Sequence, residues 1–74
     1  MPTGVQEEHL PPAITEREKE ILQLMIKGDN YKSIAQKIFI SYETVRTHVK
    51  HIYKKLHVAS RNEAVTKAIQ KGIA

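Results

Sequence analysis

The stretch that decides the fold is YETVRTHVKHIYKKLH, residues 42–57. At about 100° per residue, its aliphatic side chains fall within one narrow arc of a helical wheel. These side chains are Val45, Val49, Ile52 and Leu56, with Tyr42 and Tyr53 at the flanks. The opposite side carries polar and basic residues, namely Arg46, Thr47, Lys50 and Lys54, with Glu43 at the edge. We therefore predict a helix that is anchored by one face and presents hydrogen-bond donors on the other.

A helix of this kind has the size to enter the major groove of DNA, which is about 12 Å wide. The charge distribution supports such a partner. Residues 1–20 hold five acids against two bases, whereas residues 21–74 hold ten bases against three acids. This asymmetry indicates that the second part of the chain meets a polyanion. The alternative is an ordinary solvated basic surface, which is common on soluble domains.

The bulk composition limits the remaining possibilities. A chain of 74 residues forms one small domain, and the absence of cysteine excludes a disulfide and a thiolate metal site. No segment approaches the roughly 20 apolar residues of a membrane span, and the N-terminus has no signal-peptide pattern. We expect a cytoplasmic protein that does not enter a membrane.

Local start and stop signals divide the rest of the chain into helices. Residues 1–13 contain all three prolines, which is typical of a flexible lead-in or interdomain linker. Thr15 with Glu18 forms a capping box, and Ser60 with Glu63 repeats it. Single caps are expected before the two middle helices, and a Lys-Gly pair ends the first and last helices. These caps and stops are Asn30, Ser41, Lys27–Gly28 and Lys71–Gly72.

These signals predict an all-α fold, a compact four-helix domain over residues 14–74. The expected helices cover about 16–27, 31–38, 42–57 and 61–71. The apolar positions that should face the core from the other three helices are Ile21, Leu22, Met25, Ile26, Ile34, Ala35, Ile38, Ala64, Val65, Ala68 and Ile69.

Several of these markers recur at the spacing of one family. They are Ile14–Glu18, Ile34–Ala35, Ser41, Thr44–Val45, His48, Lys55–Leu56, Val58, Arg61 and Ala64–Val65. Over roughly residues 14–72 the chain resembles the LuxR/GerE-type helix-turn-helix domain. The segment from His48 to Lys55 is most similar to the NarL-type response-regulator branch. Two positions depart from the family pattern: Tyr31 replaces a frequent Asn and Ser33 a frequent Glu. Phe39 stands where other helix-turn-helix families have glycine, which LuxR-type domains tolerate.

The resemblance implies a bacterial transcription regulator that binds specific double-stranded DNA, with its third helix in the major groove. It implies the effector domain of a two-component response regulator, a homodimer on DNA, no enzymatic activity and no cofactor. The helix-turn-helix motif becomes Tyr31 to Lys50. The base-contacting residues become Arg46, Thr47 and Lys50, of which Arg46 and Lys50 suit guanine O6 and N7.

A second set of residues is expected to hold phosphates and so fix the register of the protein on DNA. This set is Lys32, Tyr42, Thr44, Lys54, Lys55 and Arg61. A dimer contact is assigned to the outward side of the last helix, at Asn62, Thr66 and Gln70.

Several single residues allow more than one interpretation. Glu43 can accept a hydrogen bond from a cytosine amino group or pair with Arg46 or Thr47 one turn on, and we favour the pairing within the helix. His48 and His51 are three residues apart, but no further ligand completes a metal site. The three tyrosines can stack on single-stranded bases, although positions at the margin of the core explain them more simply.

Two other classes of function were also considered. One alternative is a module similar to the terminal region of sigma factors, which shares the start at Thr15–Glu18 and docks on RNA polymerase. The second is an amphipathic peptide on a membrane surface, which the short, capped helices disfavour. The sequence shows no activated nucleophile, paired carboxylates or glycine-rich phosphate loop, so we predict that the protein is not an enzyme.

Overall fold

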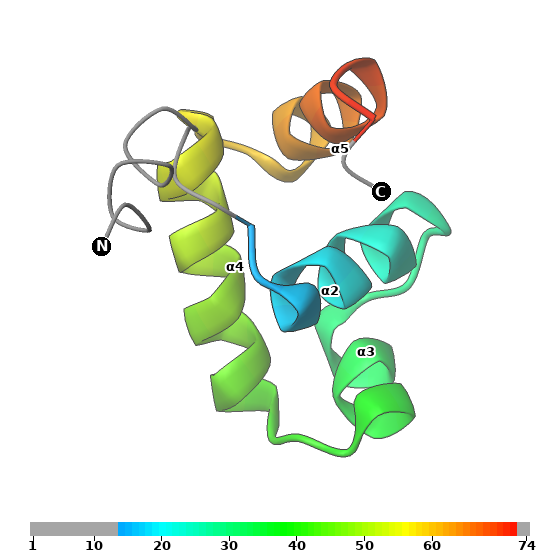
Figure 1. Cartoon of the computed structure of the whole chain (residues 1–74). Helices are drawn as coiled ribbons and strands as arrows, with labels where there is room; N and C mark the ends of the chain where they lie inside the picture. The colour runs from blue at the N-terminus through cyan, green and yellow to red at the C-terminus, as the bar shows by residue number, and fades with distance from the viewer. Residues whose placement is uncertain (1–13, 73–74) are drawn as a thin grey trace, which may run out of the picture.

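The structure is a computed structural model that describes residues 14–72, so the predicted lead-in, residues 1–13, lies outside the described residues. Four helices follow one another in the order α2 (Glu16–Ile26), α3 (Tyr31–Ile38), α4 (Tyr42–Leu56) and α5 (Arg61–Gln70). Figure 1 shows α2 at the centre, with α3 and α5 on opposite sides of it and the long α4 crossing alongside. The prediction of an all-helical fold is confirmed for this part of the chain.

Each helix begins where a side chain accepts a hydrogen bond from a free backbone N–H. Thr15 and Glu18 form the complete predicted capping box, and Asn30 and Ser41 cap α3 and α4 as expected. The box at α5 is only half formed. Ser60 accepts from the N–H of Glu63, but the Glu63 carboxylate accepts from the N–H of Ala59 at 2.7 Å rather than from Ser60. All four helix starts are therefore fixed by local sequence.

Helices α2, α4 and α5 end one residue earlier than predicted, because Lys27, His57 and Lys71 serve as C-caps. Gly28 follows the first of these with a positive φ of 101°, as the Lys-Gly signal predicts. The turn between α3 and α4 uses Phe39 in the left-handed region, with φ of 59°. A side chain there costs backbone energy that glycine avoids, and the turn is closed by a hydrogen bond from the N–H of Ile40 to the carbonyl of Ala35 at 3.1 Å.

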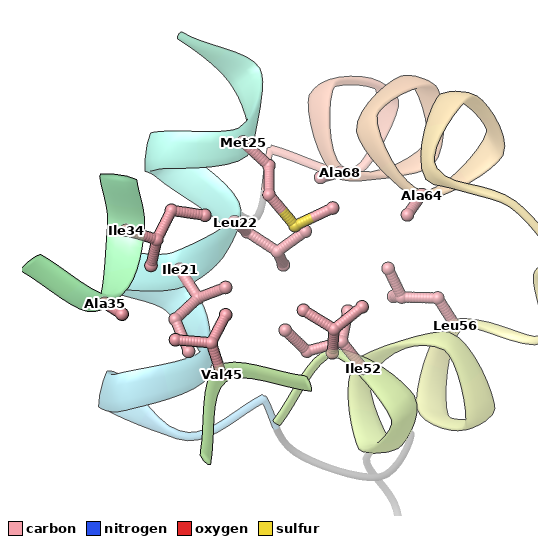
Figure 2. Close-up of a cluster of buried hydrophobic side chains, with 11 residues drawn as sticks. Ile21, Leu22, Met25, Ile34, Ala35, Val45, Ile52, Leu56, Ala64 and Ala68 are labelled. Atoms are coloured by element: carbon pink, nitrogen blue, oxygen red, sulfur yellow. The ribbon is translucent and has the colours of Figure 1, made fainter. Parts of the chain in front are cut away.

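The core is formed by one apolar stripe from each helix. The four aliphatic residues quoted from α4 are all buried, with exposed fractions between 0% and 6%. In Figure 2, Val45, Ile52 and Leu56 converge with residues of α2 and α3, namely Ile21, Leu22, Met25 and Ile34. Val49 belongs to the same cluster. At roughly 25 cal/mol for each Å² of apolar surface removed from water, this contact is the main stabilising term. The buried stripe thus fixes how α4 is rotated about its axis.

Helix α5 is attached differently. It buries only Ala64 and Ala68, whose small side chains let the helix approach Met25 and Leu56 closely. The prediction that Ile69 faces the core is wrong, because this side chain is 59% exposed. Val65 is half buried against the core, and Ile69 lies about 40° further round the helix from the line of Ala64 and Ala68, beyond the part that the core reaches. Helix α5 therefore has a weaker apolar anchor than α4.

Charged contacts hold the helix ends together. Lys55 Nζ of α4 lies 2.8 Å from Glu18 Oε1 of α2, and the Glu18 side chain is only 4% exposed. From α5, Arg61 donates to the backbone carbonyls of Met25, at 3.0 Å, and Asp29. Lys67 donates to the carbonyl of Leu56 at 3.0 Å. Such cations suit the negative ends of α2 and α4 and add directional bonds where apolar packing is thin.

Candidate nucleic-acid interface

The outer face of α4 is the candidate site. The helix has 15 residues and is about 22 Å long. Because its aliphatic stripe faces the core, the three residues predicted to read bases, Arg46, Thr47 and Lys50, are all exposed. Arg46 and Lys50 are four residues apart and so share one face, and Lys54 continues that face by one further turn. The structure thus brings together the residues that the sequence grouped.

Short-range contacts set the position of two of the side chains that the sequence predicts to read bases. Arg46 Nη1 lies 3.5 Å from Glu43 Oε2, which confirms the pairing within the helix that the sequence favoured for Glu43. The hydroxyl of Thr47 donates to the backbone carbonyl of Glu43 at 3.1 Å. Since that proton is used inside the helix, the methyl group of Thr47 is the part best suited to meet a thymine methyl.

The N-cap residue Ser41 fixes the first turn of α4. Ser41 Oγ accepts from the N–H of Thr44 at 3.0 Å and lies 2.8 Å from the Thr44 hydroxyl. Tyr42 is half exposed, and its ring packs against that of Tyr31 with 6.2 Å between centroids. The first turn of α4 therefore offers hydroxyl groups to solvent from a fixed position.

A shallow hollow lies beside this turn, where α3 begins. It is lined by Asn30, Tyr31, Lys32, Tyr42 and Arg61. Three of the six residues predicted to hold phosphates therefore border one concavity. The first N–H groups of a helix attract anions, so the start of α3 adds to the positive character of the hollow.

The six predicted phosphate contacts divide into two groups. Lys32, Tyr42, Thr44 and Lys54 are exposed. Lys55 and Arg61 are half buried and bonded within the protein, Lys55 to Glu18 and Arg61 to the end of α2. Their charges serve the fold in this structure, which the sequence prediction did not anticipate.

Electrostatic effects support this division. Burial alone raises the pKa of Glu18, but hydrogen bonds from Lys55 and Thr15 outweigh burial and hold the pKa below its ordinary value of 4.5. Glu18 therefore stays ionised at neutral pH and keeps Lys55 bound. The Glu43–Arg46 pair on the outer face of α4 is instead exposed, so water and salt screen it.

The support behind α3 was missed by the sequence analysis. Lys37 Nζ contacts both carboxylate oxygens of Asp29, at 3.0 and 2.9 Å, and Ser33 Oγ donates to the same carboxylate. The hydrogen bond from Lys37 is the main reason that the pKa of Asp29 lies below its ordinary value. Ser33 in the first turn of α3 and Lys37 in its last turn are thereby both tied to the loop that precedes the helix. The spacing of eight residues between Lys37 and Asp29 crosses a helix start, so no helical pattern signals it.

The tyrosines form a cluster between α3 and α4. The hydroxyls of Tyr31 and Tyr53 are 3.4 Å apart. Burial, followed by this hydrogen bond, raises the pKa of Tyr53 to about 12. The half-buried Tyr31 and Tyr53 lie at the margin of the core, as the simpler of the two sequence interpretations held.

Residues 14–72 offer no other kind of site of the types below. No group of three or more histidine, cysteine or acidic residues there is arranged to hold a metal ion. In the same part of the chain, none of the helices combines the length and apolarity needed to cross a lipid bilayer. The exposed cationic helix is the feature that remains to be explained.

A basic helix held against a second short helix by a three-residue turn defines a helix-turn-helix DNA-binding domain. Comparison with known proteins identifies the kind. The family described as "Bacterial regulatory proteins, luxR family" matches residues 12–68. The chain belongs to this family.

Three relatives illustrate the match. The transcriptional regulatory protein DesR of Bacillus subtilis (strain 168) is 46% identical over 59 residues, which cover 80% of this chain and 30% of DesR. The spore germination protein GerE of the same organism is 38% identical over 61 residues, covering 82% of each chain. The crystal structure of the response regulator ChrA, from a heme-sensing two-component system, superposes with a TM-score of 0.83 at 37% identity and covers 97% of this chain and 37% of ChrA.

These comparisons settle the class of function. The chain is a LuxR-type helix-turn-helix domain whose partner is double-stranded DNA, and its relatives are transcription regulators rather than enzymes. They do not favour the alternative of a module that docks on RNA polymerase. The chain spans 30% of the length of DesR and of the second Bacillus regulator YxjL, so it corresponds to one part of those proteins.

Proposed function

We propose that the chain recognises a specific operator by placing the outer face of α4 in the major groove. Arg46 and Lys50 donate to guanine O6 and N7, and the methyl group of Thr47 meets a thymine methyl. The observation that carries this proposal is the exposure of all three side chains on a helix whose opposite stripe is buried. The buried stripe fixes which side chains can reach a base edge.

The proposed contacts to the DNA backbone flank this face. Lys54 extends it along α4, whereas Thr44, Tyr42 and Lys32 lie around the start of α4 and the adjoining hollow. These groups would hold phosphates and fix the register without reading sequence. Lys55 and Arg61 are left out, because their bonds to Glu18 and to the end of α2 favour a role in the fold.

We further propose that two copies bind together through the outward side of α5, at Asn62, Thr66 and Gln70. All three side chains are exposed, and they line a groove with His57, Val58, Glu63 and Lys67. The exposed Ile69 on the same helix supplies apolar surface beside them. Dimers of this kind recognise paired half-sites whose symmetry follows that of the protein.

The wider context is also a proposal. DesR and ChrA are more than twice as long as this chain, and ChrA is a response regulator of a two-component system. By analogy, the domain acts as the effector of a cytoplasmic two-component regulator. GerE, which the chain matches over 82% of its length, supports the second possibility of a stand-alone regulator.

The proposal is tested in two stages. Selection from random duplex DNA should yield one motif repeated as two half-sites with two-fold symmetry. Lys50→Ala should then cost about 1–3 kcal/mol at particular base pairs of that operator, whereas Lys54→Ala should weaken binding to every duplex alike. Affinities of both variants are measured against a panel of single-base-pair substitutions.

Lys19→Ala, at an exposed position on α2, is the matched control and should leave all affinities nearly unchanged. Equal profiles for Lys50→Ala and Lys54→Ala across the panel would contradict the assigned roles. A selected motif without a second half-site would contradict the proposed dimer.

A further inference from the structure

Glu43 is the one acidic residue of α4, a helix that otherwise carries Arg46, Lys50, Lys54 and Lys55. Its side chain is 78% exposed and contributes nothing to the core. Ser41 already caps the helix, so Glu43 is not needed for that purpose. An acid in the first turn gains a little from the helix dipole, but in this position it also faces a polyanion.

The contacts of Glu43 connect it to the reading residues. Its carboxylate lies 3.5 Å from Arg46 Nη1, and its backbone carbonyl accepts from the hydroxyl of Thr47. The Glu43 side chain therefore restrains Arg46, whereas the bond from Thr47 goes to the backbone and does not depend on the side chain at position 43. The Glu43–Arg46 pair itself is too exposed, at 78% and 58%, to add much to stability.

We propose that Glu43 is a specificity-determining residue, whose carboxylate makes Arg46 a poor partner for phosphate while leaving it able to read guanine. This inference rests on the proposed function and concerns the specificity of the same site. A guanidinium has five N–H donors, so Arg46 can keep Nη1 near Glu43 and donate to guanine O6 and N7 with its remaining N–H groups.

On a nonspecific duplex the contacts available to Arg46 differ. Arg46 then finds mainly phosphate oxygens, and a contact to them either breaks the pair with Glu43 or brings its carboxylate close to phosphate. Both changes cost free energy, and neither is offset by a base contact. Glu43 therefore weakens nonspecific binding more than specific binding and raises the ratio between them.

The test uses Glu43→Gln, which keeps the shape of the side chain and removes its charge. Dissociation constants are measured for the selected operator and for a duplex of scrambled sequence at one salt concentration. Binding to the scrambled duplex should tighten by about fivefold, and operator binding by less than about twofold. In an Arg46→Ala background, Glu43→Gln should shift both duplexes by the same factor, because the pair is already absent.

Glu20→Gln is the matched control. Glu20 forms the same kind of exposed pair on α2, with Arg17 three residues earlier at 3.2 Å. Removing this charge should leave the ratio of the two affinities unchanged. Thermal melting of each variant checks that the fold is intact.

Two results would overturn the role of Glu43. One is an unchanged ratio of affinities in Glu43→Gln. The other is a loss limited to operators with one particular C·G pair, which would show that Glu43 reads cytosine directly. Failure of the unaltered protein to bind any duplex would instead overturn the proposed function on which the inference rests.

Discussion

Lys54 and Lys55 are neighbours in the sequence, yet they belong to two different regions of the molecule. Lys54 lies on the outer face of α4 and is exposed. Lys55 turns toward α2 and binds the buried carboxylate of Glu18. Arg46 and Arg61 repeat the contrast, since Arg46 is exposed on α4 whereas Arg61 closes the end of α2. The comparison shows that two of the six cations that the sequence predicts to contact DNA, Lys55 and Arg61, are bonded within the fold and help to hold the helices together.

The largest effect is expected where the internal contact is broken. Lys55→Met should lower the free energy of unfolding by about 3 kcal/mol, because it leaves the Glu18 carboxylate buried without its cation. Denaturant unfolding measures the loss. Lys54→Met, one residue away, is the control and should change stability by less than about 0.5 kcal/mol.

The Lys55–Glu18 pair makes the free energy of unfolding depend on pH. The folded-state pKa of Glu18 lies below its ordinary value of 4.5, so its contribution is present above pH 4.5 and is lost as pH falls through the folded value. The stability difference between the unaltered protein and Lys55→Met should therefore shrink on acidification. A difference that stays constant from neutral pH down to the acid transition would contradict this explanation.

A smaller effect is expected at the start of α5. Arg61→Ala should lower the free energy of unfolding by about 2 kcal/mol, since two backbone carbonyls at the end of α2 lose a charged donor. The affinity of the folded fraction for the operator should change by less than about twofold if Arg61 serves only the fold. Both quantities are obtained from unfolding curves and duplex titrations of one preparation.

Arg17→Ala removes an arginine from an exposed pair on α2 and is the control for Arg61→Ala. Arg17→Ala should change neither the free energy of unfolding nor the operator affinity measurably. A large loss of operator affinity in folded Arg61→Ala would place this guanidinium on DNA and remove the distinction drawn between the two regions.

The fold was predictable because most of its signals are local. The caps at Thr15, Asn30 and Ser41 and the stripe of α4 each act within a few residues, and the structure confirms all of them. The error at Ile69 has a different origin. An apolar residue on a short helix has a strong tendency to be buried, but only packing against α2 and α4 decides how wide the buried stripe of α5 is.

The site was predictable in part for the same reason. Exposure of Arg46, Thr47 and Lys50 follows from the rotation of α4 that its own apolar stripe fixes. The contacts of Lys55 and Arg61 join residues 37, 36 and 32 positions apart, and such pairs depend on how helices cross. One sequence signal could have indicated the contact of Lys55. Glu18 precedes Leu22 by four residues and so falls on the buried stripe of α2, where an acid needs a cation.

The central claim is that the cations of the outer face of α4 meet DNA whereas those of the inner contacts do not. The most direct measurement is the dependence of operator affinity on salt for Lys54→Met and Lys55→Met, each corrected for its folded fraction. The slope of log affinity against log salt should fall in magnitude by about 0.9 in Lys54→Met, for one lost phosphate contact, and should be unchanged in Lys55→Met. An equal fall in both variants would contradict the account.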